Sequence, residues 1–378
     1  MNTGSMAPAR VLMRPERPEW KAAGRLWQGI PGIERTDGGR LYACWYSGGK
    51  TEEPGNIVIL EKSDDDGQTW TDGFCVVRHD DPEVRCFDEA IWIDPRGRLW
   101  LFWTQSRLFY DGRNGVWCAV CEQPDAEEVA FSRPRRLFDG LMLNKPIAAS
   151  DGMWYFPAAL WSVSVSKPLE DHPELDSRRL AGVYASIDAG ETFEWRGGAD
   201  VPGRGFDEHM LVELKDGRLW TLVRATYGIG QAFSPDGGRT WTDAGPSGHT
   251  GPNSRFFIRR LASGRLLLVN HINPTYATNP RNWNTRNNLM AMLSEDDGKT
   301  WKGGLMLDTR DEISYPDGAQ AAGGDIYLIY DYSRYGRRQI LMAVFSEEDI
   351  LAVRLVSANG RLKQLVSQAT GKKEEEKR

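Results

Sequence analysis

Several side chains that can move a proton or hold an anion follow apolar runs in this chain. Glu208 and His209 are adjacent, and histidine is the usual side chain that exchanges a proton near neutral pH. Arg224 ends the apolar run LWTLVR, and an arginine can grip a carboxylate through two parallel hydrogen bonds. Each also has a structural interpretation, in which Arg224 pairs with a nearby carboxylate and Glu208 holds its own turn. The residue types suit acid–base chemistry on an acidic ligand.

Further polar residues stand near the predicted ends of strands, namely Asp88, Asn144, Lys145, His271 and Arg334. Asp88 or the adjacent Glu89 could serve as an acid, and Lys145 would add positive charge beside an anion. Loops are rich in polar groups in any protein, so each of them also has an ordinary structural interpretation. Together they predict a polar pocket built at the ends of strands.

The elements that would carry these residues are marked by a repeated turn. The frame Ser-x-Asp-x-Gly-x-Thr-aromatic occurs at Ser63–Trp70, Ser186–Phe193, Ser234–Trp241 and Ser294–Trp301. Its Asp can accept hydrogen bonds from its own turn, and its Gly supplies a positive φ. The closing aromatic residue suits a returning strand whose ring fills the gap between neighbouring sheets.

A second motif, a glycine followed by an apolar strand, runs in step with the first. It begins at Gly39, Gly97, Gly152, Gly217, Gly264 and Gly324, at intervals of roughly 50 to 60 residues. This spacing predicts six units of about four strands each and therefore an all-β, six-bladed β-propeller, whose closure leaves no long exposed sheet edge. A solenoid is the alternative, but it would need polar capping repeats that the sequence lacks.

The ends of the chain lie outside this repeat. We expect residues 1–9 to form a tail, residues 10–350 a single propeller domain, and residues 351–378 a C-terminal extension ending in the charged run KKEEEKR. The segment Arg10–Met13 is strand-like and could add to the last blade, which would close the ring.

Composition excludes several classes of partner. The 378 residues carry a net charge of −6, so no global basic field exists to attract nucleic acid or an anionic membrane. No apolar run is long enough to span a membrane, and Met1–Pro18 lacks a signal peptide, which predicts a cytoplasmic protein. Cys118 and Cys121 form a single CxxC in a strand-like run, typical of buried free thiols. No known metal or phosphate motif occurs, so we expect no cofactor and no metal.

The repeated turns, the six-unit period and the polar residues resemble the sialidase (neuraminidase) family of BNR-repeat propellers over roughly residues 10 to 350. The resemblance implies a glycosidase that binds a sugar carboxylate with three arginines. It also implies a Tyr nucleophile with a Glu beside it and an Asp as acid and base. A neutral phenol avoids repulsion from the substrate carboxylate until the Glu takes its proton.

The resemblance assigns roles to four residues. Tyr315, in ISYPDG, is placed like the nucleophile and Glu208 like its base, while Arg224 and Arg286 match two of the three arginines. Alternatives remain open: Tyr315 could pack against the next proline, and three other arginines compete with Arg286, namely Arg255, Arg259 and Arg281.

The first unit departs from the family. Gly29, in QGIP, stands where the family has its first arginine, and Arg25 or Arg14 could reach in as a substitute. The expected acid Asp is also missing, and the chain offers Glu52 and Glu53 instead. A bidentate arginine–carboxylate contact contributes on the order of 1.5–3 kcal/mol, so its loss alters ligand choice.

Three functions follow as hypotheses. The first is a retaining exo-glycosidase acting on sialic acid or a related terminal acidic sugar, with Tyr315, Glu208 and an acid from Glu52 or Glu53. The second is a lyase or other enzyme acting on uronate-containing glycans, with Tyr315 and His209 as base and acid. The third is a non-catalytic propeller that binds glycans.

Overall fold

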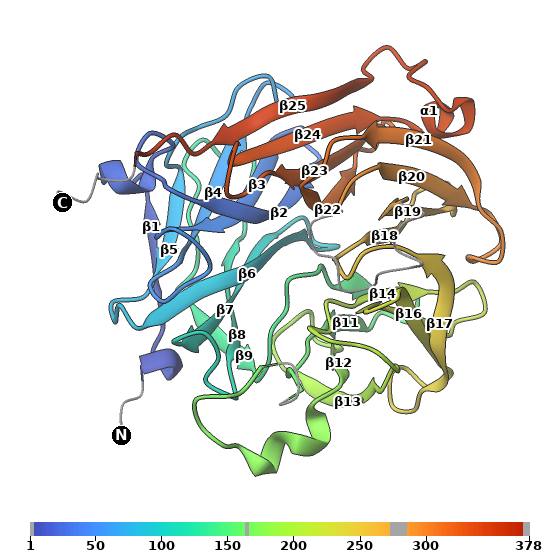
Figure 1. Ribbon diagram of the computed structural model, residues 1–378, viewed down its shortest axis with the longest axis horizontal. Helices are drawn as coiled ribbons and strands as arrows, with labels where there is room; N and C mark the ends of the chain where they lie inside the picture. Colours follow the sequence, from blue (N-terminus) through green and yellow to red (C-terminus); the bar gives the residue numbers. More distant parts are fainter. Residues whose placement is uncertain (1–3, 163–165, 273–285, 373–378) are drawn as a thin grey trace.

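The chain folds into six antiparallel sheets that follow one another around a ring (Figure 1). The computed structural model describes residues 4–162, 166–272 and 286–372. Each sheet is one blade, and its first strand along the chain, or its second in the first blade, lies at the ring's centre. The predicted six-bladed β-propeller is confirmed.

The strands are assigned to the blades as follows. The first blade holds β1 (Arg10–Met13), β2 (Gln28–Arg35), β3 (Leu41–Ser47), β4 (Ile57–Ser63) and β5 (Cys75–Arg78). The second and third hold β6 (Val84–Ile93), β7 (Leu99–Arg107), β8 (Gly115–Cys121), β9 (Arg135–Phe138), β10 (Ile147–Ala148), β11 (Trp154–Pro157), β12 (Ala181–Ser186) and β13 (Glu194–Ala199).

The remaining blades follow the same order. The fourth and fifth hold β14 (Met210–Glu213), β15 (Leu219–Ala225), β16 (Gly228–Ser234), β17 (Thr242–Thr250), β18 (Phe257–Arg260), β19 (Leu266–His271), β20 (Leu289–Ser294) and β21 (Lys302–Asp308). The sixth holds β22 (Ile313–Gln320), β23 (Ile326–Tyr332), β24 (Gln339–Phe345) and β25 (Arg361–Gln368).

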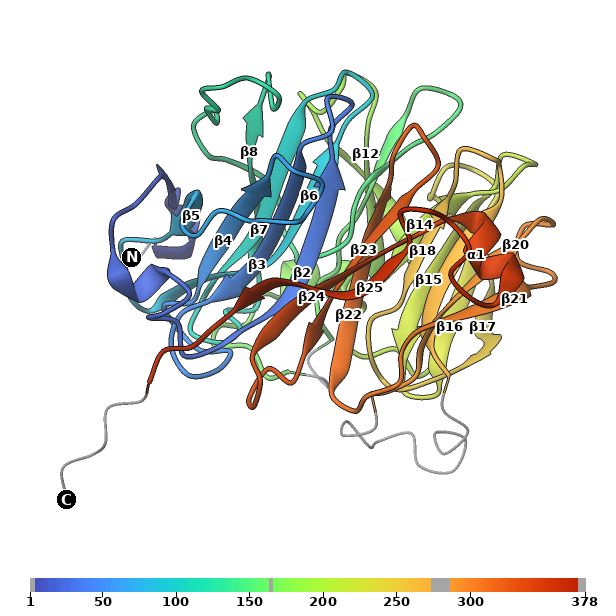
Figure 2. The ribbon, with the colours of Figure 1, turned by 90° about the horizontal axis from the view of Figure 1, so that it is seen from above.

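Helical structure is short and peripheral in the described ranges. It comprises η1 (Gly4–Met6), η2 (Pro18–Trp20), η3 (Pro173–Arg178) and α1 (Glu347–Ala352). Ser346 and Asp349 form a capping box at the start of α1, which satisfies donors that a helix end leaves open. This helix packs beside β20 and β21 (Figure 2).

Continuous apolar runs form the middle strands because both faces of a blade are covered. Every residue of β3 is buried, as is every residue of β8. The outermost strand β17 instead alternates between exposed and half-buried residues. Sheets packed on both faces by their neighbours need apolar side chains on both sides, which explains the runs in the sequence.

The chain ends differ from the expectation. β1 pairs with β5 in the first blade, with Arg10 opposite Arg78, so it does not join the last blade. β25 pairs with β24 and completes the sixth blade, so the chain beyond residue 350 still contributes to the propeller. Most of the charged run KKEEEKR, residues 373–378, lies outside the described residues.

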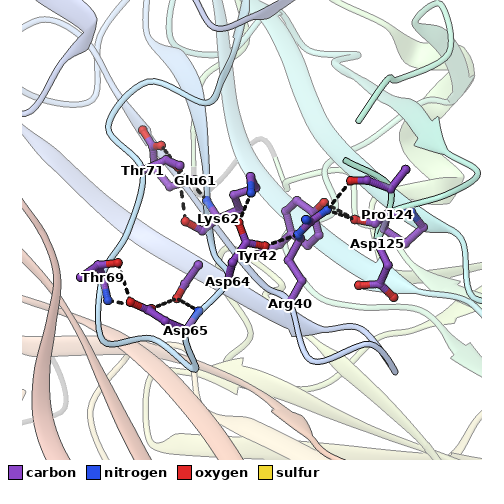
Figure 3. A network of polar contacts seen from close by, with 12 residues as sticks. Arg40, Tyr42, Glu61, Lys62, Asp64, Asp65, Thr69, Thr71, Pro124 and Asp125 are labelled. Atoms are coloured by element: carbon purple, nitrogen blue, oxygen red, sulfur yellow. Dashed lines mark hydrogen bonds and ion pairs between the residues drawn. The ribbon is translucent and has the colours of Figure 1, made fainter. Parts of the chain in front are cut away.

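Counted outward from the ring's centre, the strands that the repeated turns join are the third and fourth of four blades. In the first of them, Asp65 accepts from the Thr69 amide at 2.9 Å, from the Thr69 hydroxyl at 2.6 Å and from the Ser63 hydroxyl at 2.8 Å (Figure 3). The equivalent contacts recur around Asp188, Asp236 and Asp296. Because Ser63 lies opposite Leu41 at the start of β3, these turns mark the end of the blades where the innermost strands finish.

At the opposite end, three innermost strands carry a bulge. The pairing register shifts after Gly29 in β2, after Phe87 in β6 and after Ser314 in β22. Each bulge contains a non-glycine residue with positive φ, namely Ile30 (62°), Asp88 (45°) and Tyr315 (57°). A bulge re-aims a side chain out of the alternating pattern, and here it directs residues of separate blades toward one place.

Candidate active site

A cavity of about 360 Å³ opens at the end of the ring where the innermost strands begin. Its size falls within the usual range for small-molecule sites. Residues from all six blades or their loops line it: Ile30, Glu52, Arg85, Phe87, Asp88, Trp161, Phe206, Glu208, Arg224, Arg286, Glu312, Ser314, Tyr315, Arg334 and Tyr335. The antiparallel order places the start of each first strand beside the end of each second strand, which is how distant segments meet.

At the base of this cavity, one hydroxyl is shared by an acid and an arginine. The Tyr315 hydroxyl donates to Glu208 Oε1 at 2.9 Å and accepts from Arg224 Nη1 at 3.1 Å. Arg224 Nη1 also contacts the same Glu208 oxygen at 2.5 Å. All three side chains are buried, so the contacts form in a medium that strengthens them.

The charges around Tyr315 fix where its proton lies. Burial and the neighbouring Glu208 carboxylate raise the pKa of Tyr315 to about 12, against the opposing effect of three arginines. Burial by itself would raise the pKa of Glu208, but Arg224 and the hydrogen bonds from Arg224 and Tyr315 hold it below its usual value. The phenol is therefore neutral and Glu208 ionised before any ligand binds.

Two further arginines that line the cavity face the ring of Tyr315. The guanidinium carbon of Arg286 lies 5.4 Å from the ring centroid and that of Arg334 lies 4.9 Å from it. Arg286 donates to the Asn253 carbonyl at 3.1 Å, and burial lowers its pKa. Together with Arg224 they make one wall of the cavity cationic, which suits an anionic group of a ligand.

Arg334 occupies the space left by the absent side chain at position 29. A Cβ added to Gly29 would lie 2.2 Å from Arg334 Cδ, which is far closer than two carbon atoms can approach. The substitutes expected from the sequence do not reach the cavity: Arg25 is bound to the Trp20 carbonyl and Ser367, and Arg14 is exposed beside Glu128.

Of the two candidate acids in the first blade, only Glu52 lines the cavity. It pairs with Arg334 at 3.1 Å and lies on the loop between β3 and β4. Asn56 braces that loop by donating to the carbonyls of Gly48 at 2.6 Å and Thr51 at 3.0 Å. Glu53 instead accepts from the Lys50 amide within its own turn, so the structure does not bring it to the cavity.

The second blade supplies an acid and an arginine side by side. Burial raises the pKa of Asp88 to about 7, although Arg85 opposes the shift. Arg85 is buried with its guanidinium carbon 3.7 Å from the centroid of the Phe87 ring. Trp161 and Phe206, with ring centroids 5.2 Å apart, continue an apolar wall. This wall suits the less polar part of a ligand, as is usual in such pockets.

The two candidate histidines, His209 and His271, lie away from the cavity. The ring nitrogens of His209 lie within 2.7–2.8 Å of the carbonyls of Asp207 and Gly182, and burial lowers its pKa. Burial likewise lowers the pKa of His271 to about 4, and its Nδ1 lies 2.9 Å from the Asn287 carbonyl. These carbonyl contacts explain why neither ring is presented to a ligand.

Lys145 is also absent from the cavity, because its ammonium group is bound in a buried polar network near the axis. Its ammonium contacts Glu34 at 2.7 Å, Asp317 at 3.2 Å and the Gly318 carbonyl at 2.9 Å. Asn144, beside it, donates to the His209 carbonyl. The sequence predicted Lys145 near the end of a strand, but it could not give the direction of the side chain.

Three other arginines were alternatives to Arg286 for binding a carboxylate, and the structure describes two of them. Arg255 donates to the carbonyls of Pro31 and Tyr315 and so holds the bulges of β2 and β22 together. Arg259 donates to the Pro146 carbonyl. Arg281 lies outside the described residues.

Sequence reasoning missed several residues of the cavity wall. They are Ile30, Arg85, Phe87, Trp161, Phe206, Glu312, Ser314 and Tyr335. Arg85, three positions before Asp88 on the same strand, carried a usable signal as an arginine within an apolar run. The aromatic residues carried none, because fifteen Trp and thirteen Phe are spread through the chain.

Over the ranges 4–162, 166–272 and 286–372, no three His, Cys, Asp or Glu side chains gather as a metal site. No helix within those ranges is long and apolar enough to cross a membrane. Cys118 and Cys121 are free and buried on β8.

Comparison with known proteins defines the class. The family of BNR repeat-like domains matches residues 39–328, and the chain belongs to this family. A comparison with curated protein sequences gives no match.

Solved structures share the fold at low identity. The Hadza microbial sialidase Hz136 is 20% identical with a TM-score of 0.64, over 87% of this chain and 68% of that one. The intramolecular trans-sialidase from Ruminococcus gnavus is 14% identical with a TM-score of 0.65, over 92% and 99%. A protein of unknown function from Dyadobacter fermentans is 14% identical with a TM-score of 0.60, over 87% and 95%. The fold is thus sialidase-like, and fold alone does not define activity.

Proposed function

We propose that this protein is an exo-glycosidase that hydrolyses a terminal acidic sugar, sialic acid or a related one, with retention at the anomeric carbon. The observation that carries the proposal is the Tyr315 hydroxyl held between Glu208 at 2.9 Å and Arg224 at 3.1 Å. A nucleophile within reach of a base that a third group orients is the signature of covalent catalysis. The sialidases among the similar structures support the substrate class.

In the proposed reaction, Arg224, Arg286 and Arg334 hold the sugar carboxylate against the cationic wall. The Tyr315 oxygen attacks the anomeric carbon, and its proton passes to Glu208. Glu52 protonates the departing glycosidic oxygen. In the second step, Glu52 takes a proton from water, the resulting hydroxide displaces Tyr315, and Glu208 returns the proton to the phenol.

The order of pKa values sets the timing of the first step. Because the pKa of Tyr315 is about 12 and that of Glu208 is lowered, a free phenolate is scarce. The proton therefore leaves as the bond to carbon forms, because the neutral phenol oxygen gives electron density to the anomeric carbon and its O–H becomes more acidic. Arg224 stabilises the oxygen during this transfer.

The alternatives receive less support. The lyase hypothesis needs His209 beside Tyr315, whereas the His209 ring faces two backbone carbonyls and does not line the cavity. A pure binding module does not need a buried phenol hydrogen-bonded to a carboxylate, since such an arrangement costs desolvation without adding a ligand contact.

Two substitutions test the proposed chemistry. Tyr315→Phe and Glu208→Gln should each lower kcat by at least about a thousandfold, since they remove the nucleophile and its base. Turnover is measured with 4-methylumbelliferyl sialoside, and thermal melting confirms that each variant folds. Undiminished activity in either variant would rule out the assigned roles.

A substrate screen tests the sugar class. Sialoside-capped and uronate-capped oligosaccharides are incubated with the protein, and the released sugars are analysed. Release of a free saturated acidic sugar supports hydrolysis. An unsaturated uronate that absorbs ultraviolet light would instead establish the lyase.

A further inference from the structure

Arg334 connects the cationic wall to the acid of the first blade. Its Nε lies 3.3 Å from Asp331 and its Nη1 lies 3.1 Å from Glu52. Burial opposes its charge, but Asp331, Tyr315 and Glu52 hold its pKa above its usual value. Arg334 is therefore a permanent cation with two carboxylate partners.

The two partners differ in how firmly they are held. Asp331 is fully buried, and it also accepts from the Ile30 amide at 2.9 Å and the Ser314 hydroxyl at 2.6 Å. Glu52 has a side chain that is 31% exposed, and its carboxylate pairs with Arg334. An anion that approaches Arg334 from the cavity would therefore displace Glu52 and leave Asp331 in place.

The surroundings of Glu52 determine what such a displacement does. Among the described residues, Glu52 interacts electrostatically with Arg334 from the β23–β24 loop, Asp88 from β6 and Tyr46 from β3. Arg334 is the only cation among these three. A carboxylate that loses its cation and gains an anionic neighbour binds a proton more tightly.

We propose that Arg334 couples the binding of an acidic sugar to the protonation of Glu52. The sugar carboxylate takes over the Nη1 contact, and Glu52 takes up one proton from solvent to become a neutral carboxylic acid. Glu52 is thereby loaded as an acid when a substrate that bears a carboxylate is present. The inference rests on the proposed function for the position of the sugar carboxylate at the arginines.

Proton uptake on binding provides the test. N-Acetylneuraminic acid and glucuronic acid are titrated into the protein by calorimetry in two buffers of different ionisation enthalpy, and the difference gives the protons taken up. The measurement is made at about pH 5.5, where Asp88, with a pKa of about 7, is already protonated. We expect wild type to take up roughly half a proton or more per bound sugar.

Three variants separate the contributions. Glu52→Gln should still bind the sugar but take up almost no proton, whereas Asp88→Asn should retain the uptake. Arg337→Ala removes another arginine of the same hairpin, one that is exposed, and should change neither quantity. Melting temperatures confirm that all three variants fold.

The outcomes distinguish this inference from the proposed function. Binding without proton uptake in wild type, or unchanged uptake in Glu52→Gln, overturns the coupling and leaves the glycosidase standing. If neither sugar acid binds and no acidic glycoside is hydrolysed, the proposed function fails and the coupling fails with it.

Discussion

Asp88 combines several features that each cost folding free energy. It is a buried carboxyl group, its backbone has a φ of 45°, and its pKa is raised to about 7, mainly by burial. A residue other than glycine in this region costs on the order of 1–3 kcal/mol and persists where the surrounding structure enforces it. Such costs concentrate at functional sites, which favours a role for Asp88 in binding the ligand.

The raised pKa of Asp88 predicts how stability changes with pH. Its value is 3.8 in an unperturbed carboxyl and about 7 in the folded protein, so between these values the folded state binds more protons than the unfolded chain. Stability from this group therefore falls as the pH rises from about 4 to 7, by up to about 1.4 kcal/mol per pH unit, and is constant above that.

Asp88→Asn removes this titration. Urea unfolding of wild type and variant should show the variant gaining relative stability from pH 4.5 to pH 7, with only a small further gain, about 0.4 kcal/mol, by pH 8. Other groups titrate in both proteins and cancel in the difference. A difference that is independent of pH would show that Asp88 is not a buried, protonated acid.

At this scale the sequence predicted four residues that meet in one cavity but not their surroundings. Glu208, Arg224, Arg286 and Tyr315 converge on one cavity as the family resemblance implied. His209 could not be excluded, because whether a residue next to Glu208 faces the cavity depends on backbone direction. Lys145 was misplaced for a similar reason, since its partners Glu34 and Asp317 belong to distant blades.

The bulges in the innermost strands are the elements that build the site. Three of the six innermost strands shift register at the same end and carry a left-handed residue there, namely Ile30, Asp88 and Tyr315. A sequence pattern predicts a strand from its apolar run, but a bulge depends on the partner strand and on side chains from other blades. The strands were therefore predictable, whereas the bulges that aim their side chains were not.

Gly29 lies in the bulge of β2, and the position of Arg334 should require a glycine there, because a larger residue would overlap the arginine side chain. Gly29→Ala places a Cβ 2.2 Å from Arg334 Cδ, so the arginine must move, at a cost of about 1–3 kcal/mol in the free energy of unfolding. It should also weaken the binding of N-acetylneuraminic acid. Urea denaturation and calorimetry measure the two effects.

As a control, Gly29→Ala is also made in a protein that carries Arg334→Ala. In that protein most of the loss in the free energy of unfolding caused by Gly29→Ala should disappear. The residual effect reflects Asp331, whose carboxylate lies 3.2 Å from the added Cβ. Equal costs in both backgrounds would mean that Arg334 does not fill the space beside Gly29 in solution.

The whole molecule closes its ring without a strand shared between the two chain ends. The first blade is built from β1 to β5 and the last from β22 to β25. The repeat period predicted the number of blades, because each unit carries its own turn and glycine. It did not predict the closure, since Arg10–Met13 is strand-like but nothing in its sequence specifies β5 rather than the last blade as its partner.

Closure instead relies on packing and polar contacts across the seam between the first and last blades. An apolar cluster joins Trp45 and Ile59 to Ile329 and Ile340. Asp66, in the first repeated turn, accepts from Tyr327 and from Arg361 Nη2, the latter at 2.7 Å. The repeated turn thus serves the ring as well as its own blade.

A double-mutant cycle across this seam tests the closure. Asp66→Ala, Tyr327→Phe and the double variant are compared by urea unfolding, and the coupling between the two residues should be about 1 kcal/mol. Alanine at position 66 is strained, because the φ of Asp66 is positive (61°), and it also loses the contact with Arg361. Both effects occur with and without the tyrosine hydroxyl, so they cancel in the cycle.

The control is the exposed pair of Asp216 and Arg218 within the fourth blade, for which Asp216→Ala should change stability by no more than about 0.5 kcal/mol. A coupling energy near zero between Asp66 and Tyr327 would mean that packing in the apolar cluster is the main interaction between the first and last blades.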